Sequence, residues 1–288
     1  MSIDITITQK GLLKKPLPLT VILGERLQYG ALEGERLKPG ELGEGAFIAY
    51  LPEAIGRGFQ IFWQEGEKAK VELRSLTPTT REELRAFYDC VDRICTYWKC
   101  ELEVEGEKMA LRDFQAGFEN QADFTLRALR SMSGEILEGK HENLTLHCAM
   151  FPLTLGRGEA ERFAPAENLD GFRDFLHEKQ SMDVYYAAPM FYRDGEGVLG
   201  LFVLREGVRS VAPKAPRVPL GVQDPNTGKA LQVDRWEIVL GDADMEQVGR
   251  VPYDTFLARL PAARVSRFDG GSILLEGLTL EELRKIAE

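Results

Sequence analysis

Residues 80–99 read TREELRAFYDCVDRICTYWK and carry the clearest helical pattern of the 288-residue chain. Apolar side chains recur there every three or four residues, which predicts a helix with one continuous face packed on a core. Thr80 and Glu83 form a capping-box pattern just after Pro78, so we expect the helix to begin at this point. The apolar positions are Leu84, Phe87, Tyr88, Val91, Ile94, Cys95 and Trp98.

Short segments with strand character lie on both sides of this helix. The first is the strict alternation of Ile3, Ile5 and Ile7 with polar residues. We expect further strands at residues 17–23, 46–51, 59–63, 70–73, 101–105, 144–151, 184–192, 198–204, 236–240, 264–268 and 273–276. We expect helices at residues 114–132 and 167–179, near residue 252 and at the end, and irregular chain at 30–45 and 207–229.

These elements predict an α+β fold with short, mostly antiparallel strands and four or five helices packed on the sheets. Helices and strands do not alternate regularly enough for a doubly wound parallel sheet. We expect a single continuous unit over residues 1–288. The alternative is a split near residue 138 into two related lobes, 1–138 and 139–288.

The balance of charge and apolar residues limits the function classes. The net charge is −10, and 44% of residues are hydrophobic, as in a folded globular protein. An acidic chain repels phosphates, so we expect neither a nucleic-acid nor a membrane-surface role. The N-terminal sequence has no signal-peptide pattern, and four cysteines form no disulfide framework, so we expect a cytoplasmic protein.

Two segments resemble each other at an interval of 100 residues. LPEAIGRG at residues 51–58 and FPLTLGRG at residues 151–158 each carry a proline four residues before the first glycine. The pattern leaves open both a duplicated βαβ-like unit and a coincidence in a glycine-rich chain.

Arg57 and Arg157 are the candidate binding residues, because each lies between two glycines. A glycine-flanked backbone can approach a ligand closely, and a guanidinium group can anchor an anion. The alternative is a turn whose arginine is solvated.

The cysteines and histidines favour structural roles over catalysis or metal binding. Cys90, Cys95 and Cys100 are spaced five apart, so on a helix successive thiols face different directions. Zinc sites require closer pairs, and we expect no metal and no cofactor. We also expect structural roles for the histidines, which are His141, His147 and His177.

Two other segments lack residues that a ligand site requires. Residues 225–230, PNTGKA, lack the first glycine and the Ser or Thr of a phosphate-binding loop. Residues 242–246 contain three acidic side chains, but Gln247 stands where a calcium loop needs glycine.

The motifs around the first helix resemble an uncharacterised family of Firmicutes proteins of about 300 residues. The resemblance rests on Gly56-Arg57-Gly58-Phe59, on Thr79 to Glu83, and on Tyr97-Trp98-Lys99, within residues 50–105. It implies a bacterial cytoplasmic protein and no assigned reaction.

Two functions are compatible with the sequence. The first is a binding or interaction protein without catalysis, whose partner is another protein, favoured by the proline-rich segment Val211–Leu220. The second is an enzyme that acts on a small anionic ligand anchored by Arg57 or Arg157.

Overall fold

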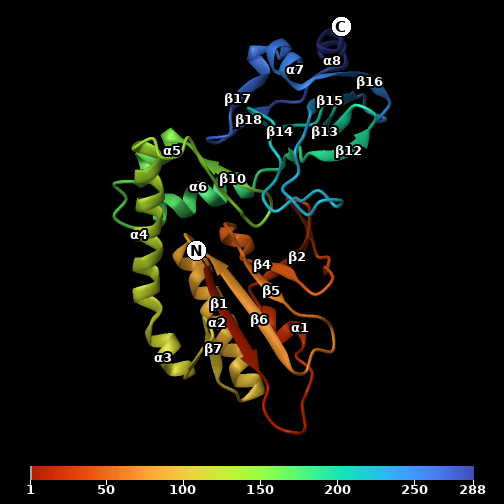
Figure 1. Cartoon of the computed structure of the whole chain (residues 1–288). Helices are drawn as coiled ribbons and strands as arrows, with labels where there is room; N and C mark the ends of the chain where they lie inside the picture. Colours follow the sequence, from red (N-terminus) through yellow and green to blue (C-terminus); the bar gives the residue numbers. More distant parts are fainter. Residues whose placement is uncertain (1) are drawn as a thin grey trace. The chain divides into compact units, whose positions relative to one another are not determined.

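The fold was analysed in a computed structural model that describes residues 2–288. Contacts between Cα atoms divide the chain into two units, the first ending at Met182 and the second running from Asp183 to Glu288. Both units combine helices with short-stranded, mostly antiparallel sheets, so the predicted α+β class is confirmed (Figure 1). Residues 2–288 contain eight α-helices, more than the four or five expected.

The first unit is built on an eight-stranded antiparallel sheet with the order β3-β2-β4-β5-β6-β1-β7-β8. The strand β1 pairs with β6 along its whole length, from Ser2 opposite Leu76 to Thr8 opposite Lys70. The strands are β1 (Ser2–Thr8), β2 (Gln28–Glu33), β3 (Arg36–Pro39), β4 (Phe47–Tyr50), β5 (Phe59–Phe62), β6 (Lys70–Leu76), β7 (Leu102–Val104) and β8 (Glu107–Met109).

Two helices, α1 (Leu19–Leu23) and α2 (Arg81–Trp98), share one hydrophobic core with the sheet. Alternate residues of β1, namely Ile3, Ile5 and Ile7, are buried in this core, as the two-residue period of a strand requires. The apolar stripe of α2 is buried there as well, so the helix predicted from its periodicity is confirmed.

The remainder of the first unit is mostly helical. Phe163 packs edge-on against Phe172 and Phe175, which joins α5 to α6. The elements are the 3₁₀ helix η1 (Pro52–Ala54), α3 (Leu111–Ala116), α4 (Phe118–Leu137), β9 (Leu144–Leu146), β10 (Leu153–Leu155), α5 (Arg157–Phe163) and α6 (Asp170–Gln180).

The second unit has two four-stranded sheets, ordered β11-β14-β18-β17 and β12-β13-β15-β16. Its core includes Phe202, Ile238, Tyr253 and Phe256. The elements are β11 (Tyr185–Tyr186), β12 (Met190–Asp194), β13 (Gly197–Arg205), β14 (Ser210–Pro213), β15 (Arg235–Gly241), β16 (Gln247–Pro252), α7 (Tyr253–Arg259), the 3₁₀ helix η2 (Ala262–Arg264), β17 (Val265–Arg267), β18 (Ser272–Leu275) and α8 (Leu280–Ala287).

Several segments differ from the sequence-based expectation, and three of them have a clear physical reason or a clear structural outcome. Residues 17–23 were expected to form a strand, but Pro18 precedes the short helix α1, because a brief apolar run fits a buried helix equally well. Residues 30–45 were expected to be irregular, but they contain most of the β2–β3 hairpin, whose turn includes Gly34. The strand β14 interrupts the irregular segment expected at residues 207–229.

The two units meet after residue 182, and whether the chain folds as one continuous unit or as two lobes divided near residue 138 stays a prediction. The two resembling segments also have different local structures. Residues 56–58 form a loop before β5, whereas Arg157 and Gly158 begin α5. The duplication therefore stays a hypothesis.

Within residues 2–288, none of the helices has the length and apolar character that a membrane span requires.

Candidate functional site

The most unusual surface feature of the first unit is the loop of residues 9–17, which joins β1 to α1. We call it the leucine loop, because Leu12 and Leu13 at its tip have relative exposures of 102% and 96%. It is the red loop at the lower end of the first unit in Figure 1. Isolated exposed leucines are common, but two fully exposed neighbours form an apolar surface that needs an explanation.

The base of the leucine loop is closed by one buried side chain, that of Gln9, which is only 4% exposed. Its amide nitrogen Nε2 donates hydrogen bonds to the carbonyl oxygens of Lys15, at 2.8 Å, and Lys68, at 2.7 Å. Its oxygen Oε1 accepts a hydrogen bond from the Lys15 backbone N–H at 2.9 Å. Gln9 thereby holds the two ends of the loop together and fastens them to the β5–β6 turn.

Two tryptophans from different elements hold the second half of the loop. Trp98 Nε1, at the end of α2, donates to the Lys15 carbonyl at 3.1 Å. Trp63 Nε1, which follows β5, donates to the Leu17 carbonyl at 3.1 Å. Loops whose ends are close and fastened by their own side chains are a recurrent form of functional surface loop. The leucines are therefore displayed on an ordered support.

The flanks of the tip are basic, with Lys10 on one side and Lys14 and Lys15 on the other. Lys10 Nζ pairs with Glu101 at 2.7 Å, and this hydrogen bond raises the pKa of Lys10 above its ordinary value. Lys15 Nζ lies 3.6 Å from the centre of the Tyr97 ring, a cation–π contact. The tip is thus a pair of exposed leucines flanked by lysines.

Arg57, a candidate binding residue, is 6% exposed and bonded to the protein's own backbone. Its Nε donates to the carbonyl of His147 and its Nη1 to the carbonyl of Pro78, both at 2.8 Å. Burial lowers the pKa of this guanidinium group. These bonds join three distant segments, so Arg57 has a structural role in this arrangement.

The backbone next to Arg57 binds a buried carboxylate, that of Glu83. Glu83 Oε2 accepts from the Arg57 N–H at 3.0 Å, and Oε1 accepts from the Gly58 N–H at 2.6 Å. Thr79 Oγ1 also donates to Oε2, at 2.9 Å. Thr80 caps α2 as predicted, because its Oγ1 accepts a hydrogen bond from the Glu83 N–H at 3.1 Å. The Glu83 carboxylate binds the backbone N–H groups of the loop that contains Arg57 and Gly58.

Arg157, the second candidate, has a different environment. Its side chain is 74% exposed and pairs with Glu161 Oε1, one turn further along α5, at 3.0 Å. Within residues 2–288 no contact joins the Arg57 and Arg157 side chains, so the structure does not assemble them into one anion clamp.

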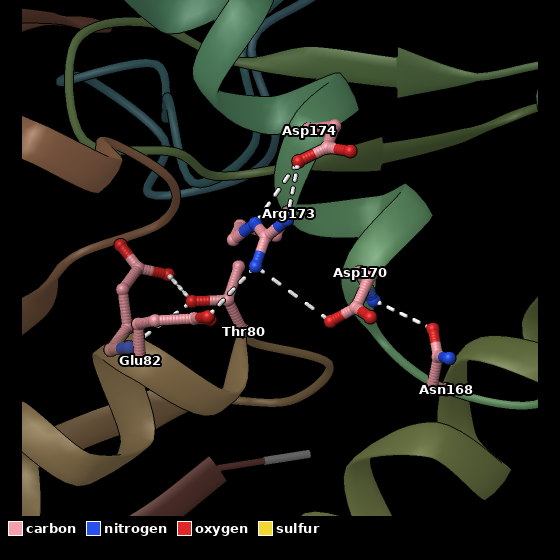
Figure 2. Close-up of polar contacts among 7 residues, drawn as sticks. Thr80, Glu82, Asn168, Asp170, Arg173 and Asp174 are labelled. Atoms are coloured by element: carbon pink, nitrogen blue, oxygen red, sulfur yellow. Dashed lines mark hydrogen bonds and ion pairs between the residues drawn. The ribbon is translucent and has the colours of Figure 1, made fainter.

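A third arginine lies among carboxylates from two helices (Figure 2). Arg173 of α6 pairs with Glu82 of α2 at 3.1 Å, with Asp174 at 2.8 Å and with Asp170 at 3.7 Å. Hydrogen bonds to Asp174 and Glu82 raise the pKa of Arg173. The three acidic partners surround the guanidinium group, so this cluster ties α6 to α2 and is a poor receptor for an anion.

The remaining candidate residues have structural surroundings. His177 Nδ1 accepts a hydrogen bond from the Ile55 backbone N–H at 3.0 Å. Burial raises the pKa of Cys90 to about 12, which makes it an inert thiol. The Asp242 carboxylate accepts from the N–H groups of Asp244 and Glu246, both at 2.9 Å. In the part of the chain that is described, no three His, Cys, Asp or Glu side chains are grouped to hold a metal ion.

The proline-rich segment is only partly available to a partner. Val211 and Ala212 are buried in β14, contrary to the exposed appearance of this sequence, whereas Leu220 is exposed. Leu12 and Leu13, which are more exposed, are not among the residues that the sequence patterns predicted to be functional. The sequence pattern that could have indicated them is a pair of leucines between a glycine and two lysines, because such a pair is not part of a longer apolar segment.

The sequence was compared with protein families, curated proteins and solved structures. The model of one family, Domain of unknown function (DUF4299), matches residues 2–286. The chain belongs to this family. The DUF4299 match covers nearly the whole chain, which confirms the expected membership of a family without an assigned reaction. No curated protein and no solved structure matches the chain significantly.

Proposed function

We propose that this chain is a cytoplasmic binding protein without catalytic activity, and that the leucine loop is the part that recognises its protein partner. The observation that carries this proposal is the combination of two fully exposed leucines with a loop base that is firmly bonded. A loop selected only to connect β1 with α1 needs neither feature.

The expected energetics support recognition by the leucine pair. Burying one leucine side chain is worth roughly 1.5–3 kcal/mol, so two would supply a substantial part of a micromolar affinity. Binding also costs the ordering of flexible loops, and here the Gln9 and Trp98 hydrogen bonds already hold the base of the loop. Less of the loop would therefore have to be ordered when the partner binds.

The chemistry of the tip defines what the partner must offer. Leu12 and Leu13 require an apolar pocket, since few side chains are more costly to leave in water. Lys10, Lys14 and Lys15 around them favour an acidic rim on that pocket, through complementary charge. The net charge of −10 for the whole chain makes a nucleic-acid partner a poor match.

The alternative, an enzyme that anchors a small anionic substrate with Arg57 or Arg157, has less support. Arg57 uses two of its donors on backbone carbonyls, and Arg157 pairs with Glu161 in solvent. A recognition role for the leucine loop requires no rearrangement of either residue.

The proposal can be tested by affinity capture with the full-length chain from a lysate of the source organism, followed by binding measurements on the purified partner. The double variant Leu12→Ser/Leu13→Ser should lose at least about 10-fold in affinity, because each leucine anchor is worth more than 1.4 kcal/mol. Leu42→Ser is the control, an exposed leucine elsewhere in the first unit, and should bind like the wild type.

Two results would contradict the proposal. One is an equal affinity of the double variant and the wild type for the purified partner. The other is a monodisperse monomer that retains no partner at all under native conditions.

A further inference from the structure

The C-terminal end of α2 brings together two cysteines that a continuous helix would separate. The helix ends at Trp98, and Lys99 adopts the left-handed conformation, with φ 52° and ψ 53°. The chain then reverses, and the Cys100 N–H donates to the Cys95 carbonyl at 3.2 Å. The expectation that successive thiols face different directions is therefore wrong for Cys95 and Cys100.

This bond between residues five apart is the one that defines a Schellman motif. Such motifs usually place the two bonded residues' side chains in contact, most often as an apolar pair. Here both positions are cysteine, so the motif places the Cys95 and Cys100 side chains next to each other, and each thiol shifts the pKa of the other. Cys95 is buried in the core of the first unit, whereas Cys100 is only partly buried.

The charges around the pair distinguish the two sulfur atoms. The neighbouring Cys95 thiol lowers the pKa of Cys100, partial burial opposes this shift, Lys10 lowers the pKa further, and Glu101 raises it. The Cys100 thiol, followed by burial, raises the pKa of Cys95, with Asp92 and Cys90 adding to the effect. Cys100 is thus the sulfur that carries thiolate character and reaches solvent, and Cys95 is the protonated neighbour behind it.

We propose that Cys95 and Cys100 form an oxidisable dithiol, a modification site at which a hydroperoxide converts the pair into a disulfide. This inference is independent of the proposed function of the leucine loop. It follows from the helix end, which places a solvent-accessible thiol in contact with a buried one within a single turn of chain.

The reaction has two steps and needs no group other than the hydroperoxide. The Cys100 thiolate attacks the terminal peroxide oxygen, the O–O bond breaks, and the alcohol leaves with a proton while Cys100 becomes a sulfenic acid. The Cys95 sulfur then attacks the Cys100 sulfur, the S–S bond forms, and the sulfenic oxygen leaves as water with the Cys95 proton. Two thiols lose two electrons and two protons, and the hydroperoxide is reduced to an alcohol and water.

The chain offers a direct test, because trypsin cleaves after Lys99, between the two cysteines. The purified full-length protein is treated with hydrogen peroxide, alkylated, and digested without reduction. We expect residues 94–99 and 100–108 to be recovered as one disulfide-linked species about 2 Da lighter than the sum of the two peptides. Reduction with a dithiol should release them.

Two variants set the controls. Cys100→Ser should abolish the linked species, and Cys148→Ser should leave its yield unchanged, because Cys148 is a buried thiol elsewhere in the first unit. Recovery of the two peptides unlinked from peroxide-treated wild type, with Cys100 either unmodified or oxidised alone, would overturn the proposal. Linkage of Cys100 to any cysteine other than Cys95 would overturn it as well.

Discussion

The two ends of α2 differ in how their polar groups and neighbouring side chains are used. At the N-terminal end, the Glu83 carboxylate and the Arg57 guanidinium group are buried and bonded to several segments of the first unit. At the C-terminal end, Trp98 supports a loop that holds Leu12 and Leu13 in solvent, and Cys100 lies against Cys95.

This difference separates the part of the helix that stabilises the fold from the part that is available for interaction. Groups at the first end are satisfied inside the protein, so changing them should cost stability. Leu12, Leu13 and Cys100 at the second end are fully or partly exposed, so changing them should alter binding or reactivity and cost little stability. Four predictions follow this division, in order of decreasing free-energy change.

Glu83→Ala should have the largest effect, a loss of about 3 kcal/mol or more from the free energy of unfolding. The buried N–H groups of Arg57 and Gly58 would lose their charged acceptor, and each unsatisfied buried donor costs about 1–3 kcal/mol. Urea denaturation measures this change. Glu82→Ala, which removes only a partly exposed pair with Arg173, is the control and should cost about 1 kcal/mol or less. Equal losses in the two variants would contradict the structural role of Glu83.

Gln9→Ala should lower the free energy of unfolding by about 2 kcal/mol, since three hydrogen bonds at the base of the leucine loop are lost. Its more specific effect is on the loop, whose backbone N–H groups should exchange faster with solvent deuterium. Lys10→Ala removes only the exposed pair with Glu101 and should change neither quantity appreciably. Unchanged exchange in Gln9→Ala would show that the loop is held by other contacts.

Cys95→Ala should slow the alkylation of Cys100 at neutral pH by about threefold or more. The alanine methyl group cannot donate a hydrogen bond, so the pKa of Cys100, which the Cys95 thiol lowers, should rise toward its ordinary value. Less thiolate is then present at a given pH, and the midpoint of the rate profile moves to higher pH. Iodoacetamide labelling followed peptide by peptide between pH 6 and about 10 measures this shift. A midpoint identical to that of the wild type would contradict the assigned roles of the two thiols.

Leu12→Ser/Leu13→Ser should have the smallest effect on stability, within about 0.5 kcal/mol, because fully exposed side chains make few contacts in the folded state. Thermal unfolding and urea denaturation both measure it. This result, together with a lost partner, would assign the leucines to binding. A loss of several kcal/mol would show instead that they stabilise the fold.

The elements with a strong local pattern were predictable from the sequence. The helix α2, its Thr80 cap and the alternating strand β1 needed only the spacing of their apolar residues. The hairpin β2–β3 was not predicted, because a glycine such as Gly30 is typical of a loop. In the sheet this glycine is needed for close approach, since a Cβ atom there would lie 2.6 Å from the Lys38 carbonyl oxygen.

The candidate sites were less predictable, because they depend on contacts between distant residues or on a break in local structure. The loop that displays Leu12 and Leu13 is closed by a bond from Gln9 to a carbonyl 59 residues away. The Cys95–Cys100 contact depends on the left-handed backbone at Lys99. This conformation is usual for glycine, so a lysine at this position does not indicate it. Arg57 was predicted to bind a ligand, and the glycines on either side of it give no sign that its side chain is buried against backbone carbonyls.

The bond from Gln9 to Lys68 also sets an order of events during synthesis. The first strand and the leucines leave the ribosome long before residue 68, so the loop cannot close until the β5–β6 turn has emerged. A partner that requires the closed loop would not bind a nascent chain that is too short to contain Lys68. Recognition would then begin only after the β5–β6 turn has formed.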